Sequence, residues 1–459
     1  MRGDSIAGKP KVGMDLTQGS IFRNLLIFAI PMVMTNIIQQ LYSLVDLIVI
    51  GKFVGSIGTV GVSSGGEVAD LVTPIASAFS NAGQIYISQL IGARMEEKLK
   101  KCIGTLFFLM LLMSIILTGI TILFCSLILK LLNCPQEAMS QASSYMIITA
   151  LGMPFIFGYN AVCGILRGMG ESKKPLEFII IAAIINVILD VILVAYFHME
   201  AAGTAIATVV AQIGSFVASF MFMYRHREHF DFQLKISYFK PDKQAARIIF
   251  FQGFPQAIRS MFVRFSLLWV NSHINSYGLV AAATNSVGNK IHKFLDVFTA
   301  GVSQASGAMV GQNLGARKLE RAAKTVWYTF AISIGIAGCL SLLSLTIPRQ
   351  IFSIFTNDVE VLDMGTIYMG ILVWHFICSA MTSSFQSMVI GSGYASMNFM
   401  IGILDGVICK IGLSLLFVDV MKMGVIGYFW GIDLSRALPG IICVIFFVSG
   451  RWKKRKLLS

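Results

Sequence analysis

An amide and a carboxylate lie one helical turn apart in an otherwise apolar stretch, "INVILDVILV" at residues 185–194. Asn186 and Asp190 are four residues apart, so on a helix their side chains share one face. Asp46 and Thr208 are expected at a similar depth of two other apolar segments, because an α-helix rises ~1.5 Å per residue. A charge at mid-membrane costs at least ~2.5 kcal/mol on insertion scales, so these acids need a partner or a role.

The two acids are expected to lack a basic neighbour, because no lysine or arginine of the first half of the chain falls at their depth. Two carboxylates without a cation repel each other, and they favour a shared proton or a bound small cation. We therefore predict a cation-coupling site for H⁺ or Na⁺. The alternative is a buried hydrogen-bond network that only fixes helix packing. The predicted site residues are Asp46, Asn186, Asp190 and Thr208.

Twelve apolar segments are predicted to position these side chains. The chain has 459 residues, of which 56% are hydrophobic and 13% are charged, about half the charged fraction of soluble domains. Runs of ~20 apolar residues are long enough to cross a bilayer, and lipid requires every backbone group to be paired. We predict an all-α membrane protein with spans at 21–50, 57–83, 102–125, 139–165, 175–197, 201–224, 247–272, 280–306, 325–347, 363–388, 395–418 and 424–449.

The net charge of +13 comes largely from lysines and arginines that lie in every second loop between the predicted spans. If the N-terminus is inside, the inner segments carry nearly all loop lysines and arginines, which is typical of positive-inside topology. This distribution explains the charge without a nucleic acid partner, and it predicts that both termini lie in the cytoplasm. The expected location is a bacterial inner membrane. The expected organisation is a cytoplasmic N-terminus (1–20), an N-lobe (21–224), a cytoplasmic linker (225–246), a C-lobe (247–449) and a basic cytoplasmic tail (450–459).

One unit of six spans occurs twice. "SQLIGARMEEKLKK" at 88–101 and "GQNLGARKLERAAK" at 311–324 share residues at a constant offset, and Gln89 and Gln312 are one such pair. An even number of spans makes the halves parallel, related by a pseudo-twofold axis along the membrane normal, as in alternating-access transporters. We predict that both segments form short amphipathic helices on the inner surface.

Further charged residues lie within the predicted spans of the second half. We interpret them as internally neutralised ion pairs, and a substrate-binding role is the alternative. They form a candidate C-lobe polar cluster of Arg259, Asp405, Asp433 and Arg436.

Opposite charges occupy matched positions of the two repeats. Glu67 and Asp70 lie on one face of the second span, and their equivalents in the eighth span are Lys290 and Lys293. We hypothesise that these charges latch the lobes or line the substrate path; the alternative is that each faces water. Two prolines are candidate bending points of spans 1 and 4, namely Pro31 and Pro154.

A series of motifs resembles the multidrug and toxic compound extrusion (MATE) family over roughly residues 20–450. The motifs are "YSLVDLIVIGKFVG", "SQLIGAR", "GILRGMGESKKP", "NVILDVIL", "AAGTAIAT" and "GQNLGAR". The resemblance implies a V-shaped pair of six-helix lobes, export by cation-coupled antiport, and a cation site at the four residues named above. Some branches of the family carry acids in spans 7 and 10, whereas this chain has no acid in span 7 and offers His375 and Gln386 in span 10.

These observations predict a secondary exporter of amphipathic, cationic compounds in exchange for H⁺ or Na⁺. The alternative is a flippase for lipid-linked oligosaccharides or lipids, whose pyrophosphate could bind Arg259, Arg264, Lys290 and Lys293. An enzyme is disfavoured because no H-E-x-x-H occurs, and no phosphate-binding loop indicates ATP use. We expect no cofactor and no metal site. The expected partners are small-molecule substrates and membrane lipids, and the expected state is a monomer.

Overall fold

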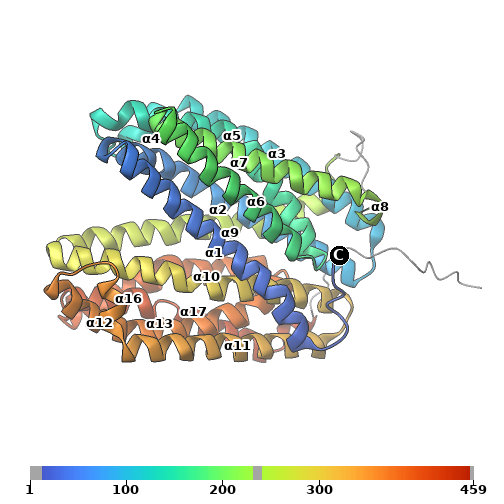
Figure 1. The fold of residues 1–459 in the computed structure, drawn as a ribbon. Coiled ribbons are helices and arrows are strands. Elements are labelled where there is room, and N and C mark those ends of the chain that lie inside the picture. The colour runs from blue at the N-terminus through green and yellow to red at the C-terminus, as the bar shows by residue number, and fades with distance from the viewer. Residues whose placement is uncertain (1–12, 231–239, 455–459) are drawn as a thin grey trace, which may run out of the picture.

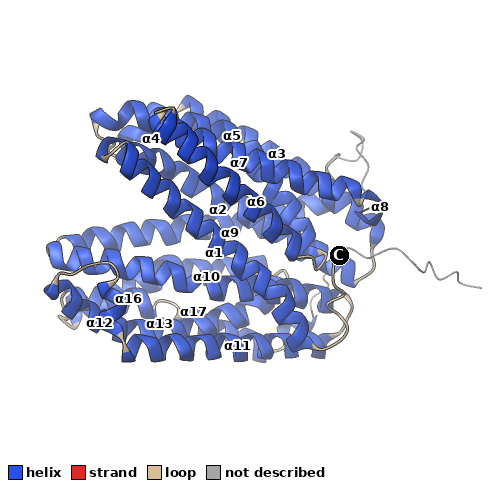
Figure 2. Cartoon of the chain, in the orientation of Figure 1, coloured by secondary structure: helices blue, strands red, loops and turns tan. Residues whose placement is uncertain are grey.

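The computed structural model describes residues 13–230 and 240–454. Within these residues the chain is built of helices and loops (Figure 2). The first bundle contains α1 (Ile21–Phe53), α2 (Ser56–Gly92), α3 (Glu96–Leu123), α4 (Cys125–Leu131), α5 (Met139–Gly168), α6 (Lys173–Asp190) with a π-helical turn (Val191–Tyr196), and α7 (Glu200–Arg225), after which comes the short α8 (Arg227–Phe230).

The second bundle repeats this order. It contains α9 (Lys243–Asn275), α10 (Leu279–Gly315), α11 (Leu319–Thr346), α12 (Pro348–Ser353), α13 (Val359–Gly391), α14 (Ala395–Ile403), α15 (Cys409–Leu415), α16 (Val425–Leu434) and α17 (Ala437–Val448), with π-helical turns at Leu404–Ile408 and Leu416–Val420.

Each of the twelve predicted spans falls on these helices, which confirms the all-α membrane fold. Nine helical stretches of the described residues are long and apolar enough to cross a membrane. The helices α2, α9 and α10 are also long, with 37, 33 and 37 residues, but their sequences are more polar. These three helices therefore carry polar side chains that lipid alone would not accommodate.

The two bundles form the arms of a V (Figure 1). They lie close together at the end where α1 begins and diverge toward the end that carries α4 and α12. Most contacts between the bundles come from α1 and α2 on one side and from α9 and α10 on the other. The linker runs from the end of α7 to Lys243, and its residues 231–239 lie outside the described part of the chain.

A pair of repeated glutamines joins the bundles near the closed end of the V. The Gln89 Nε2 atom donates to the Gly391 carbonyl at 2.7 Å, and the Gln312 Nε2 atom donates to the Gly168 carbonyl at 3.1 Å. Both glutamines are buried, and the two bonds are related by the repeat. We call these two bonds the glutamine pair.

The same contact requires glycine in both helices. A Cβ atom on Gly92 would collide with the Gln312 carbonyl oxygen, and one on Gly315 would collide with the Gln89 carbonyl oxygen. Only glycine allows the ends of α2 and α10 to approach this closely. The repeat found in the sequence is therefore a structural pseudo-twofold at the interface of the bundles.

The segment before α1 also closes this end. The Leu16 backbone N–H donates to Gln312 Oε1 at 3.1 Å, and Arg321 donates to the carbonyls of Gln18 and Gly19 at 2.6 and 2.8 Å. Residues of the N-terminal segment thus bind to α10 and α11 of the second bundle.

The prediction of separate amphipathic helices at 88–101 and 311–324 is wrong. Each segment is the last turn of one long helix, a tight turn and the first turns of the next helix. Arg94 and Arg317 hold the turns with φ values of 56° and 58°. The Met95 N–H bonds back to the Leu90 carbonyl in the pattern of a helix C-terminal cap. Each segment looked like one amphipathic helix because helical residues stand on both sides of the turn, and the turn itself does not interrupt the polar pattern.

Both candidate bending prolines lie inside continuous helices, Pro31 in α1 and Pro154 in α5. Proline lacks the N–H that would bond to the preceding turn, so each leaves a local gap in the helical ladder. The buried Thr35 hydroxyl donates to the Pro31 carbonyl at 2.8 Å. Their role as bending points stays a prediction.

Candidate functional site

The structure brings the four predicted cation-site residues together inside the first bundle. Asp46 comes from α1, Asn186 and Asp190 from α6, and Thr208 from α7, and α6 contacts both other helices. The two acids and the amide are buried, whereas Thr208 is half-buried. Side chains that are far apart in the sequence thus converge on one buried point.

Local sequence explains how these helices meet. Asp190 is the last residue of α6, and the following turn, Val191–Tyr196, is π-helical. Single π-helical turns occur often at functional sites, because the wider turn re-aims neighbouring side chains. On α7, the small buried residues Ala201 and Ala205 belong to one cluster with Val194 of the π-helical turn and with Val49 and Ile50 of α1. Small residues of this kind allow close helix packing.

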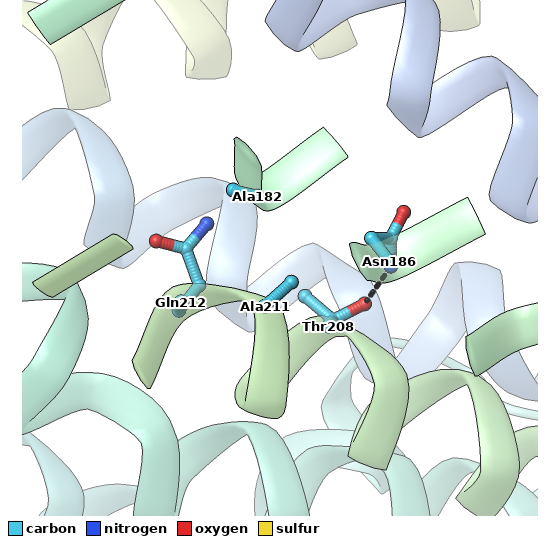
Figure 3. A pocket seen from close by; sticks show the side chains of 5 residues that line it. All are labelled: Ala182, Asn186, Thr208, Ala211 and Gln212. Carbon is cyan, nitrogen blue, oxygen red and sulfur yellow. Dashed lines mark hydrogen bonds between the residues drawn. The ribbon is translucent and has the colours of Figure 1, made fainter. Parts of the chain in front are cut away.

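The site is rich in hydrogen-bond acceptors and poor in donors. The Asp46 carboxyl lies within hydrogen-bonding reach of the Asp190 carboxyl and the Asn186 amide. The Asn186 Nδ2 atom donates to Thr208 Oγ1 at 3.4 Å (Figure 3). If both acids are ionised, Asp46 Oδ1 and both Asp190 oxygens accept no hydrogen bond from any described residue. The arrangement is therefore short of one positive charge.

A small pocket opens beside this site between α6 and α7 (Figure 3). Its lining adds Gln212, which is not among the predicted site residues. Gln212 lies one turn after Thr208, so the i, i+4 spacing on a predicted span was a signal that could have found it. The other lining residues are Ala182, Asn186, Thr208 and Ala211.

A second polar cluster occupies the other bundle, and here the acids have basic partners. Arg436 binds Asp296 through two hydrogen bonds of 2.8 and 3.0 Å, and its Nε atom lies 4.0 Å from Asp405 Oδ1. Arg259 bonds to Asp405 at 3.1 Å. The structure therefore joins three of the four predicted cluster residues and adds Asp296 as a partner of Arg436.

Asp433, the fourth predicted residue, has histidine neighbours instead. His292 Nε2 lies 2.9 Å from Asp433 Oδ1, and His375 Nδ1 lies 3.7 Å from the same atom. The two imidazole rings are close, with centroids 3.7 Å apart. Linear spacing did not reveal this group, because each member comes from a different helix.

The four matched charges on α2 and α10 are exposed, which agrees with the alternative that they face water. Asp70 forms an ion pair across the two bundles, but its partner is Arg264 of α9, at 3.4 Å. The Lys290 ammonium lies 5.9 Å from the centre of the Phe355 ring. In this structure the interbundle partner of Asp70 is therefore an arginine and not a lysine of α10.

Comparisons with known proteins match nearly the whole chain. The family model described as MatE matches twice, at residues 31–192 and 255–416, in agreement with the repeat. A probable multidrug resistance protein of Bacillus subtilis, YoeA, is 24% identical, and the match covers 98% of each chain. The multidrug export protein MepA of Staphylococcus saprophyticus is 22% identical, with 93% of this chain and 94% of MepA covered.

Solved structures share the fold. An outward-facing multidrug resistance MATE family transporter of the MOP superfamily superimposes with a TM-score of 0.90 at 20% identity, over 98% of this chain and 100% of that one. A MOP superfamily transporter from Pyrococcus furiosus gives a TM-score of 0.89 at 20% identity, over 98% and 100% of the two chains, and is described as having a binding pocket of reverse polarity.

Proposed function

Because the chain belongs to the MatE family, we propose that it is a secondary multidrug efflux transporter that exchanges amphipathic, cationic compounds for H⁺ or Na⁺. The observation that carries this proposal is the buried pair of Asp46 and Asp190. Its carboxyl groups lie side by side, and none of the ion pairs among the described residues includes either acid.

Such a pair can couple transport to an ion gradient. Two neighbouring carboxylates in a medium of low dielectric repel each other strongly, so the site favours one proton or one small cation. The oxygens of Asn186 and Thr208 complete a set of oxygen ligands that also suits Na⁺. A ligand shifts a conformational equilibrium only by its difference in affinity for the two states. The site therefore drives alternation if one state of the N-lobe holds the cation more tightly.

We propose that the structure represents the outward-open state. The positive-inside distribution supports a cytoplasmic location for the closed end of the V. There the glutamine pair and the N-terminal segment join the bundles. The diverging ends then face outward.

The cycle follows from these features. Cation entry from outside neutralises the acid pair and permits α1 and α6 to pack more closely. The gap in the helical ladder at Pro31 gives α1 a place to bend. Compound release and closure of the outer ends follow, and opening toward the cytoplasm requires the glutamine pair to break.

The flippase alternative is weakened by the partners of two of its basic residues. Arg259 bonds to Asp405, and Arg264 pairs with Asp70. A pyrophosphate would have to displace both carboxylates, so the exposed Lys290 and Lys293 are the remaining bases for that role.

The test is uptake of a fluorescent lipophilic cation into everted membrane vesicles, with a proton gradient and a sodium gradient imposed separately. We expect one gradient alone to drive uptake and its dissipation to release the compound. Uptake that needs ATP with both gradients collapsed, or equal uptake in vesicles without the protein, would contradict the proposal.

A further inference from the structure

Three side chains of the second bundle converge with metal-ligand geometry. One ligand atom each of His292, His375 and Asp433 lies within 4.8 Å of the other two. They come from α10, α13 and α16, so three helices hold them in place. We propose that these residues bind a divalent first-row transition-metal ion of the Zn²⁺ class, in contrast to the sequence expectation of no metal site.

The distances fit such an ion with small adjustments. Ligand atoms around a tetrahedral Zn²⁺ lie about 3.4 Å apart, since Zn–N bonds are ~2.0–2.1 Å. Asp433 Oδ1 lies 2.9 Å from His292 Nε2 and 3.7 Å from His375 Nδ1. Two imidazole nitrogens and one carboxylate oxygen favour Zn²⁺, Co²⁺ or Ni²⁺ over the oxygen-seeking Mg²⁺ and Ca²⁺.

A second acid supports the outer side of both histidines. Asp296 Oδ1 lies 3.2 Å from His375 Nε2, and Asp296 Oδ2 lies 3.8 Å from His292 Nδ1. Each ring thus faces Asp433 with one nitrogen and Asp296 with the other. A carboxylate on the outer nitrogen of a metal-bound histidine holds its tautomer and orientation. Arg436 in turn holds Asp296 with two hydrogen bonds.

Two buried ligand atoms of this group are unsatisfied. His375 Nδ1 and Asp433 Oδ2 have no hydrogen-bond partner among residues 13–230 and 240–454, and their residues are 2% and 0% exposed. When His375 Nε2–H donates to Asp296, its Nδ1 presents a lone pair, which is the form that binds metal. An unpaired buried acceptor costs free energy, and a metal ion bound by His375 Nδ1 and by both oxygens of Asp433 would satisfy both atoms.

One side of the group is partly exposed. The side chains of His292 and Asp296 are 16% and 30% exposed, so water reaches one side of the cluster. Three acids and three bases already balance in this region, so a bound dication leaves a net positive charge. An anion or hydroxide at the fourth position would reduce that charge. The bases are Arg259, Lys410 and Arg436, and the acids are Asp296, Asp405 and Asp433.

The test is titration of purified, full-length protein with Co²⁺ after removal of any affinity tag. We expect one saturable equivalent per chain, with the visible absorption of tetrahedral Co²⁺, and competition by Zn²⁺. His375→Gln and Asp433→Asn should abolish this signal. Asp296→Asn should weaken binding ~10–100-fold, as for other outer-shell carboxylates. His198→Gln is the matched control, because His198 is exposed in the first bundle and should bind normally.

A second variant decides the case if these substitutions unfold the protein. His375→Cys replaces one ligand with a thiolate, so the Co²⁺ complex should gain a sulfur-to-metal charge-transfer band. Its appearance supports His375 as a ligand. Absence of a saturable site in the wild type, or an unchanged spectrum and stoichiometry in His375→Cys, would overturn the proposal.

Discussion

The two bundles solve the problem of buried acids in opposite ways. In the first bundle, Asp46 and Asp190 face each other and take part in none of the ion pairs of the described chain. In the second, Asp296 and Asp405 are bound by Arg436, which is only 26% exposed. Burying unpaired charge is costly unless it is neutralised. The acid pair of the first bundle therefore lacks a compensating charge, whereas Asp296 and Asp405 already have one in Arg436.

This difference shows what duplication preserved. The repeated backbone contacts survive in both halves, as the bonds from Gln89 and Gln312 demonstrate. The charges differ between the halves: the position equivalent to Asp190 is Leu413 or Ser414. A shared scaffold thus carries one acid pair without a basic partner and one group of acids that arginines neutralise. Four variants can break or sharpen this contrast.

The largest expected effect is complete loss of coupled transport in Asp190→Asn. The variant removes one acid of the pair, so the site no longer needs a cation in either state. Folding should be unimpaired, because the substitution removes a buried carboxylate that has no partner and therefore costs free energy. Vesicle uptake and a thermal melt measure both properties. Asp419→Asn, an exposed acid of the second bundle, is the control. Normal gradient-driven uptake by Asp190→Asn would remove the acid pair from the mechanism.

The second largest effect is expected for Arg436, which neutralises Asp296 and Asp405. Arg436→Met should destabilise the protein by ~3–5 kcal/mol, because Asp296 and Asp405 would stay buried without their shared arginine. Arg349→Met is the matched control: its 2.8 Å pair with Asp363 is more than half exposed, so its loss should cost less than ~1 kcal/mol. Denaturant or thermal unfolding in detergent compares the two. Equal stabilities would contradict the view of the cluster as a neutral structural network.

A smaller effect is expected where the bundles join. The double variant Gln89→Ala and Gln312→Ala removes two buried hydrogen bonds of ~0.5–1.5 kcal/mol each, so it should shift the balance toward the inward-open state ~5–150-fold. Labelling of Ser88→Cys from the inner side, in a chain without its native cysteines, reports the opening. Gln141→Ala is the control, since Gln141 bonds to Glu200 within one bundle. Unchanged labelling would show that the pair does not hold the inner side closed.

The smallest effect tests the rim of the cation site. Thr208→Val keeps the shape of the side chain but removes the oxygen that accepts from Asn186. We expect apparent affinity for the coupling ion to fall about fivefold, as for the loss of about 1 kcal/mol. Thr204→Val is the control, because the buried Thr204 hydroxyl has no partner in the described chain. An equal change in both variants would assign Thr208 to packing alone.

Local pattern determined the number of spans, their order and the repeat. Span length follows from bilayer thickness and polarity, which act on consecutive residues. Depth along a helix also follows from residue count, and for that reason counting residues along each span was enough to group Asp46, Asn186, Asp190 and Thr208. The caps at Arg94 and Arg317 were missed, because a left-handed turn occupied by arginine leaves no glycine as a signal.

The sequence by itself determined which residues sit at which depth of which helix, because hydrophobic length and helical rise are properties of each segment alone. Only the tertiary structure decided the partners: Asp70 with Arg264 instead of a lysine, Arg436 with Asp296, and His292 beside His375. Which face of a helix meets which neighbour depends on packing between segments distant in the chain. The spacing of residues along one helix does not indicate which neighbouring helix each face contacts. The partners of the charged residues in the second bundle could therefore be identified only from the three-dimensional structure.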